Sequence, residues 1–284
     1  MNIKGINDKF ELLNGVKIPS LGFGTWQSDD GDMAINSILS ALEYGYRHID
    51  TAAAYLNEKS VGKAIIESKI PREEIFITSK VWNDKRGYDS TKIAFAKTCE
   101  DLQVDYLDLY LIHWPASSSR FENWDEINLD TWRAITELYK EGKIKAIGVS
   151  NFLPHHLKSL MQTEIKPMIN QIEFHPGYTQ DEAVQYCKDN GIIVEAWSPL
   201  GSGSLLKNIE LEKIAKKHNK SIAQICIRWC LQKGVVVLPK SVTKSRILEN
   251  TQVFDFEISD DDMDKINNIG EESFSGSHPD KVDF

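Results

Sequence analysis

The sequence predicts an α/β protein, a (β/α)8 TIM barrel with an N-terminal β-hairpin capping the barrel bottom. Two observations lead to this prediction: eight short apolar segments recur along the chain, and amphipathic helical patterns separate them. The segments are rich in Ile, Val and Leu and mostly lack strict alternation, as expected for parallel strands covered on both faces. Because no linker interrupts the eight repeats, we expect one domain over residues 1–284.

A doubly wound open sheet is the alternative architecture. Sheets of that kind usually carry a phosphate-binding glycine loop after the first strand. No such loop follows the first apolar segment here, so the closed barrel is favoured.

The elements are taken in chain order. The segment FELLNGVKIPS predicts a hairpin in which Asn14-Gly15 forms a two-residue turn. The expected strands lie in SLGFGTW (20–26), RHIDTA (47–52), IFITSK (75–80), LDLYLIH (107–113), IKAIGVSN (144–151), MINQIEF (168–174), IIVEAWS (192–198) and VVVLPKS (235–241).

Helical patterns fill the intervals between the strands. The first, residues 32–45, stops at Gly45, and the pattern over 89–103 begins with Asp89 and Ser90 as candidate N-caps. A third pattern, residues 130–143, places Gly142 just beyond its end. Residues 115–128 are expected to form a loop.

Composition excludes several partners. The chain has 42 acidic and 33 basic residues and a formal net charge of −9, which gives it no electrostatic footprint for nucleic acids or anionic membranes. No apolar run approaches the roughly 18 residues of a membrane span, and the N-terminal residues lack the apolar core of a secretory signal. We therefore expect a cytoplasmic protein, and also a monomer.

No metal site is expected. The four cysteines form no CxxC pair and are expected to be reduced core thiols. His155 and His156 lie at an expected helix start and suggest no metal geometry.

Polar residues at the expected strand exits are the candidates for chemistry, because barrel enzymes place their sites at the carboxyl ends of the strands. Asp50, Lys80 and His113 end the second, third and fourth strands, and Tyr55 follows Asp50 by five residues. Each alone has an ordinary structural explanation, as a cap, a solvated cation, a rim residue or a packing ring. In a closed barrel, however, all four converge on one mouth.

The four side chains together predict carbonyl chemistry. A free phenol has a pKa near about 10 and is a poor acid at neutral pH. A nearby ammonium, held by Asp50, would lower the pKa of Tyr55 and make it a better proton donor, while His113 orients the carbonyl oxygen. Since no side chain supplies hydride, a nicotinamide cofactor is required.

At this point the sequence resembles the aldo-keto reductases, in particular microbial members of the 2,5-diketogluconate and methylglyoxal reductase type. GYRHIDTAAAYLNE, IFITSKVWN, LDLYLIHWP, IGVSNF, NQIEFHP, AWSPLG and PKSVTKSRILEN match the family's segments in order, over essentially the whole chain. The resemblance implies a catalytic tetrad of Asp50, Tyr55, Lys80 and His113, and NADPH lying across the barrel mouth without a Rossmann domain.

The resemblance also assigns binding residues. It places Gly24 and Thr25 near the ribose and nicotinamide, with Trp26 beside them facing the substrate. We expect Trp82 and Trp114 to line the substrate pocket together with Trp26. The nicotinamide carboxamide would be bound by Ser150, Asn151 and Gln171, with Trp197 stacked on the ring, and Ser198 and Leu200 would lie along the pyrophosphate. The 2′-phosphate end corresponds to Lys240, Ser241, Thr243, Arg246, Glu249 and Asn250.

Elementary chemistry supports a phosphate site in the segment that contains Lys240 and Arg246. Thr243 is a plausible N-cap of a short helix that starts at Lys244. A helix N-terminus with Lys240 and Arg246 nearby is an anion site, which favours NADP over NAD. A capped surface helix with ordinary basic residues is the alternative explanation.

Three hypotheses for function follow from these residues. The first is an NADPH-dependent reductase of small aldehydes and α-dicarbonyls such as methylglyoxal, with keto-sugars also considered. The second is a barrel lyase with Lys80 as Schiff-base nucleophile, and the third is a barrel that binds NADPH without catalysis. The short C-terminal tail, residues 271–284, predicts an open and permissive pocket.

Overall fold

The computed structural model describes residues 3–271 and 273–284, and within them eight parallel strands form one sheet in the order β10-β9-β8-β7-β6-β5-β4-β3. The sheet closes on itself, because Gly22 N donates to Val237 O at 2.9 Å and Val237 N donates to Ser20 O at 3.0 Å. The predicted barrel is confirmed. Its strands are β3 (Phe23–Gly24), β4 (His48–Asp50), β5 (Phe76–Val81), β6 (Leu107–Ile112), β7 (Ile144–Ser150), β8 (Ile169–Glu173), β9 (Ile193–Trp197) and β10 (Val236–Val237).

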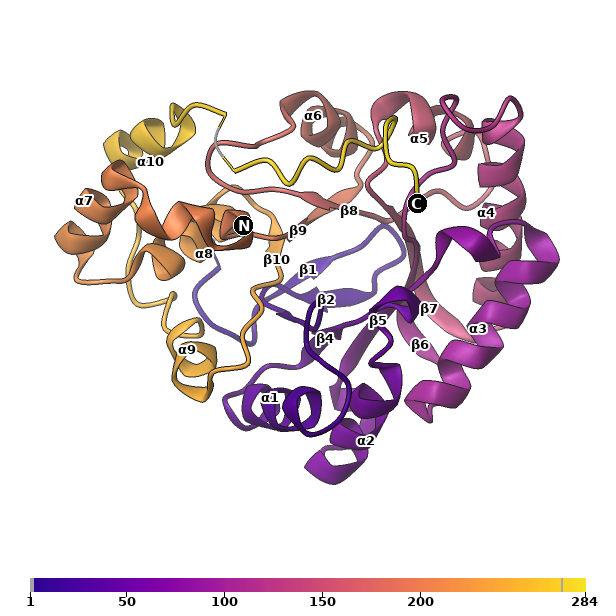
Figure 1. Ribbon diagram of the computed structural model, residues 1–284, viewed down its shortest axis with the longest axis horizontal. Helices are drawn as coiled ribbons and strands as arrows, with labels where there is room; N and C mark the ends of the chain where they lie inside the picture. Colours follow the sequence, from indigo (N-terminus) through magenta and orange to yellow (C-terminus); the bar gives the residue numbers. More distant parts are fainter. Residues whose placement is uncertain (1–2, 272) are drawn as a thin grey trace.

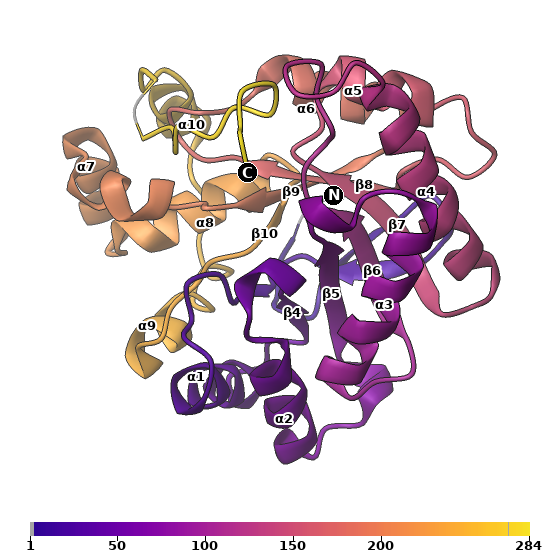
Figure 2. The same ribbon diagram turned by 45° about the vertical axis from the view of Figure 1, so that its right-hand side comes forward.

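Helices surround the strands (Figures 1 and 2). Every residue of β5 and β8 is buried, which explains why apolar and polar residues do not alternate strictly in these segments. The helices are α1 (Asp32–Glu43), α2 (Glu58–Ser68), α3 (Tyr88–Leu102), α4 (Trp124–Lys140), α5 (Pro154–Leu160), α6 (Asp181–Asp189), α7 (Ile209–His218), α8 (Ile222–Gln232), α9 (Lys244–Glu249) and α10 (Asp260–Asn267).

The N-terminal hairpin is present, but its turn differs from the prediction. β1 (Lys9–Glu11) pairs antiparallel with β2 (Lys17–Pro19), and Leu12 N donates to Val16 O at 2.8 Å. Three residues therefore form the loop instead of two. Gly15 has φ 84° while Asn14 is not among the residues with positive φ, whereas a two-residue type I′ turn needs positive φ at both positions.

Two helix starts also differ from the prediction. α3 begins at Tyr88 with Gly87 as N-cap, so Asp89 and Ser90 lie in the first turn and do not cap it. Gly87 has φ 95°, a backbone conformation that favours glycine over Asp or Ser. α4 begins at Trp124, so the end of the predicted 115–128 loop is helical.

The predicted helix ends at Gly45 and Gly142 are confirmed, with φ of 96° and 75° directly after the C-cap residues of α1 and α4. The four cysteines are free, as expected, and three of them are buried. Among the described residues, no helix is long and apolar enough to cross a membrane.

Candidate active site

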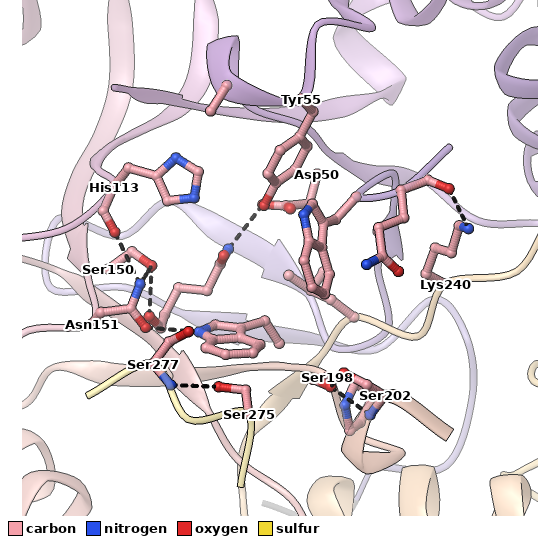
Figure 3. A pocket seen from close by; sticks show the side chains of 18 of the residues that line it. Asp50, Tyr55, His113, Ser150, Asn151, Ser198, Ser202, Lys240, Ser275 and Ser277 are labelled. Atoms are coloured by element: carbon pink, nitrogen blue, oxygen red, sulfur yellow. Dashed lines mark hydrogen bonds between the residues drawn. The ribbon is translucent and has the colours of Figure 1, made fainter. Parts of the chain in front are cut away.

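The exits of β4, β5 and β6 bring the predicted catalytic side chains together. Asp50 and Lys80 are strand residues, His113 directly follows β6, and Tyr55 ends a 3-10 turn over Ala53–Tyr55 that begins three residues beyond β4. Figure 3 shows Asp50, Tyr55 and His113 at the wall of one pocket. Their convergence is what the strand-exit argument predicts.

Lys80 is the centre of this cluster. It is fully buried, and its Nζ donates to Asp50 Oδ1 at 2.8 Å, to Thr51 O at 3.0 Å and to Tyr55 Oη at 3.2 Å. An ammonium has three hydrogens, so these acceptors use its whole donor capacity. The pairing offsets the cost of burying the charge.

The pKa of Tyr55 corrects one expectation. Burial raises it above its ordinary value, and although Lys80 acts to lower it as predicted, the net shift is upward. Burial also acts to lower the pKa of Lys80, but Asp50 and Tyr55 outweigh burial and the pKa of Lys80 is raised. Tyr55 is therefore protonated at neutral pH, and the Lys80 ammonium is placed where it can stabilise a phenolate.

His113 is neutral at this site. Burial, followed by the charges of Lys80 and Arg86, lowers its pKa well below the usual value. Its Nδ1 is buried and has no hydrogen-bond partner. Because an unpaired buried N–H is rarer than an unpaired acceptor, we assign the proton to Nε2, which leaves a neutral donor.

A cavity of about 1310 Å³ joins these residues to most of the other predicted site residues. The lining includes Gly24, Trp26, Asp50, Tyr55, Trp82, His113, Trp114, Ser150, Asn151, Gln171, Trp197, Ser198, Leu200, Lys240, Ser241, Arg246, Glu249 and Asn250. Three predicted residues do not line it. Lys80 lies behind Tyr55, Thr25 is buried with its hydroxyl donating to Asp50 O at 2.9 Å, and Thr243 flanks α9.

Strained backbone shapes the cavity at two strand exits. Asn151 after β7 and Ser198 after β9 have φ of 63° and 52°, which is uncommon for residues with a side chain. Asn151 Oδ1 accepts from Trp197 Nε1 at 2.8 Å, and Asn151 Nδ2 donates to His113 O at 3.0 Å. This network fixes the indole as part of the cavity wall.

The basic end of the cavity contains two of the cations in the predicted phosphate segment. Lys240 and Arg246 line the cavity, and Lys240 Nζ donates to Gln27 O at 2.7 Å (Figure 3). Lys244 instead pairs with Glu43 of α1 at 2.9 Å. Thr243 is the N-cap residue of α9 as predicted, but its side chain makes no capping hydrogen bond.

The C-terminal tail forms part of the cavity wall, so the cavity is less open on this side than the sequence suggested. The Phe284 ring stacks on Trp82 at 5.6 Å between centroids and meets Trp114 edge-on at 5.4 Å. Phe284 O accepts from Asn83 Nδ2 at 3.1 Å and from Arg120 Nη1 at 2.6 Å. The tail therefore narrows the side of the cavity that the tryptophans form.

Buried Glu173 holds an earlier part of the tail. Its carboxylate accepts from Ser275 N at 3.0 Å and from Ser275 Oγ at 2.7 Å. Sequence reasoning missed Ser275 and Phe284 as lining residues, because no local pattern indicates where an irregular tail lies. The only sequence signal was an acidic residue, Glu173, at the end of a buried strand.

His155 and His156 begin α5 as expected, but they also meet an acid from the tail. The Nε2 atom of each lies 3.0 Å from Asp280 Oδ1, a grouping with metal-binding residue types. His156 Nδ1, however, accepts from Leu153 N at 3.2 Å. That bond places the proton of the neutral ring on Nε2, which leaves no lone pair there for a metal. We interpret the cluster as a further tail anchor.

Comparisons with known proteins agree with one another. The model of the aldo/keto reductase family matches residues 20–271. The chain is 53% identical to a glyoxal reductase of Bacillus subtilis, over 98% of this chain and 99% of that protein. It is 48% identical to a 9,11-endoperoxide prostaglandin H2 reductase of Trypanosoma cruzi, over 95% of this chain and 94% of that protein.

Solved structures give the same result. An aldo-keto reductase enzyme from a Medee basin deep-sea metagenome library superposes with a TM-score of 0.91 at 46% identity, covering 97% of this chain and 100% of that one. A single-residue variant of Gox0644 in complex with NADPH superposes with a TM-score of 0.90 at 38% identity, covering 97% and 98% of the two chains.

Proposed function

This chain belongs to the aldo/keto reductase family, and from that premise we propose that it reduces small aldehydes and α-dicarbonyls such as methylglyoxal to alcohols with NADPH. As a member of the family it is an NADP-dependent oxidoreductase acting on carbonyl compounds. The observation that carries the proposal is the Tyr55–Lys80–Asp50 cluster at the wall of a large cavity. Keto-sugars are a further candidate class. We also propose that residues 1–284 act as one domain.

The cavity fits the cofactor at three places. Two cations, Lys240 and Arg246, line one end, which suits a phosphate. The Trp197 indole offers an apolar face in the middle, and Gln171 presents an amide near Asp50. At Gly24 an added Cβ would come within 3.4 Å of Leu238 O, so a bare backbone leaves more room at the cavity wall. When bound, NADPH supplies the hydride for the reaction.

The protein's own groups prepare the carbonyl and provide the proton. His113 Nε2 donates a hydrogen bond to the carbonyl oxygen and orients it toward Tyr55. As negative charge develops on that oxygen, Tyr55 Oη donates its proton to it. The Lys80 ammonium, 3.2 Å from Tyr55 Oη, then stabilises the phenolate until solvent returns a proton.

A Schiff-base lyase is disfavoured by the same geometry. Lys80 is fully buried, does not line the cavity and donates to three acceptors. A nucleophilic amine must be neutral and reach the substrate, whereas the pKa of Lys80 is raised by Asp50 and Tyr55, which outweigh burial.

A barrel that binds NADPH without catalysis would show binding but no turnover.

The proposal is tested by NADPH consumption with methylglyoxal and an aromatic aldehyde, run in parallel with NADH. We expect turnover with both carbonyl compounds and a preference for NADPH. NADPH binding without oxidation on any carbonyl would instead support the non-catalytic alternative. The monomeric state and the cytoplasmic location stay predictions from the sequence.

We expect Arg246→Ala to weaken NADPH binding by roughly 10- to 150-fold, the equivalent of one charged hydrogen bond of about 1.5–3 kcal/mol. NADH binding should change little, because NADH has no 2′-phosphate. Dissociation constants from quenching of tryptophan fluorescence measure both. Lys244→Ala is the matched control, since Lys244 pairs with Glu43 instead of lining the cavity. Equal losses for both cofactors would contradict the assignment.

We expect Phe284→Ala to favour bulky aldehydes over methylglyoxal. The ratio of the kcat/KM value for a bulky aldehyde to that for methylglyoxal should rise about 2- to 12-fold, which corresponds to the loss of an aromatic contact of about 0.5–1.5 kcal/mol. The ring closes the pocket against Trp82 and Trp114. Phe274→Ala is the control, because Phe274 stacks on Tyr178 at 4.6 Å and does not line the cavity. An identical shift in the control would assign the effect to tail order instead of the Phe284 ring.

A further inference from the structure

The barrel interior beneath the active site contains more polar groups than the four proposed catalytic residues. TIM-barrel interiors are mostly filled with branched apolar side chains. Here β4, β5, β8 and β9 contribute a continuous set of buried polar side chains, His48, Asp50, Thr78, Lys80, Gln171 and Glu195. Glu195 is completely buried, and neither the proposed proton transfer nor cofactor binding yet uses it. A buried acid is costly, so its partners indicate its purpose.

Glu195 shares one partner with Asp50. Gln171 Nε2 donates to Asp50 Oδ2 at 2.8 Å and to Glu195 Oε2 at 2.7 Å. Gln171 and Glu195 are register partners on neighbouring strands β8 and β9, so the backbone fixes this contact. An amide nitrogen has two hydrogens, and the two acids use both. The orientation of the amide is therefore set, and Oε1 is the atom left to face the cavity that Gln171 lines.

Charge balance determines the form of Glu195. The titratable groups that face it are His48 and Asp50 from β4, Lys80 from β5 and Tyr55 beyond β4. Burial, and then the charge of Asp50, raises the pKa of Glu195 to about 8. Burial, and then Lys80, lowers the pKa of His48 to about 3. Burial also raises the pKa of Asp50, although Lys80 and Gln171 act to lower it. Because Asp50 Oδ1 pairs with Lys80 Nζ at 2.8 Å while Glu195 Oε1 has only the neutral His48 ring at 3.8 Å, we assign the negative charge to Asp50 and the proton to Glu195.

We propose that Glu195 is a positioning residue for the reductase reaction. With Asp50 it holds both amide hydrogens of Gln171, so that Gln171 Oε1 faces the cavity as an acceptor for the nicotinamide carboxamide. In its neutral form it leaves Asp50 as the single negative partner of Lys80. This inference rests on the proposed function, because it takes the nicotinamide to lie against Gln171.

Without Glu195, one N–H of Gln171 loses its acceptor, and only the bond to Asp50 still orients the amide. Gln171 Oε1 would then be held less firmly toward the cofactor carboxamide. Glu195 also has a predictable pH effect. Above about pH 8 it gains a negative charge, which raises the pKa of Tyr55 further and makes Tyr55 a weaker acid.

The first test is a double-mutant cycle on NADPH binding, measured at pH 7 by fluorescence quenching. We expect Glu195→Ala and Gln171→Ala each to weaken binding roughly tenfold, and the double variant to bind no more weakly than Gln171→Ala alone. Glu58→Gln is the matched control, because Glu58 is a buried acid that contacts Ser79 at 2.6 Å and does not contact Gln171. Any effect of Glu58→Gln on NADPH binding should therefore add to that of Gln171→Ala. If the losses in NADPH affinity caused by Glu195→Ala and Gln171→Ala added up in the double variant, the proposal would be overturned.

The second test uses the conservative variant Glu195→Gln, whose amide oxygen can still accept from Gln171. We expect wild-type NADPH affinity at pH 7, and a kcat/KM that stays level above pH 8 where that of the wild type falls. Superimposable pH profiles would overturn the inference.

In the protein without cofactor, a carboxylic-acid infrared band at pH 7 that Glu195→Gln removes would support the neutral form, and no change in that band would contradict it. If the wild type failed to oxidise NADPH with any carbonyl compound, the proposed function would be contradicted, while the double-mutant cycle on NADPH binding could still be interpreted.

Discussion

Replacing Tyr55 by phenylalanine is expected to lower kcat for carbonyl reduction by about 10²- to 10⁴-fold, the range for loss of a general acid. The ring and its packing near His113 remain, while the atom proposed to donate the proton is removed. Because the hydroxyl has Lys80 as its hydrogen-bond partner and the proposed phosphate-binding end of the cavity is untouched, NADPH affinity should stay close to that of the wild type. NADPH oxidation and fluorescence titration of the cofactor measure the two quantities separately.

Tyr46→Phe is the control for this prediction. Its hydroxyl is buried without a hydrogen-bond partner, and the residue lies in the core away from the cavity lining. Removing it should leave kcat unchanged. Turnover by the Tyr55→Phe variant at the wild-type rate would exclude Tyr55 as the proton donor.

Replacing Lys80 by methionine is expected to damage both stability and catalysis. It leaves Asp50 as an unpaired buried carboxylate, which should cost about 3–5 kcal/mol of the free energy of unfolding. It also removes the cation proposed to stabilise the Tyr55 phenolate, so kcat should fall by about 10²-fold or more. Urea denaturation gives the first quantity, and NADPH oxidation by the folded protein gives the second.

A double variant separates the two effects. Adding Asp50→Asn to Lys80→Met removes the unpaired charge, so part of the lost stability should return while kcat stays low. If activity recovered together with stability, Lys80 would have only a structural role. If Lys80→Met alone kept its stability, the buried ion pair would not be the source of the cost.

Local features of the sequence predicted most of the fold. The apolar segments became the strands, and Gly45 and Gly142 ended their helices, because these signals depend on a few neighbouring residues. Predictions of fine local geometry were less accurate. The N-terminal turn has one residue more than predicted, and α3 begins after Gly87 instead of being capped by Asp89 or Ser90.

The same division holds at the proposed active site. The convergence of Asp50, Tyr55, Lys80 and His113 could be predicted from their positions at or just beyond strand ends, because closure of a barrel brings neighbouring strand ends to one mouth. The upward shift in the pKa of Tyr55 could not be predicted, since it reflects burial first and Lys80 only second. The position of Phe284 could not be predicted either, because its ring reaches Trp82 through an irregular tail.

The sequence by itself determined the order of strands and helices and the chemical types of side chain at each strand exit. The tertiary structure decided which of those side chains share protons and charge. Gln171 meets Asp50 across 121 positions of sequence, and Glu195 meets Gln171 on the adjacent strand. Such contacts depend on closure of the whole barrel and on exclusion of water from its interior, and neither can be read from a short stretch of residues.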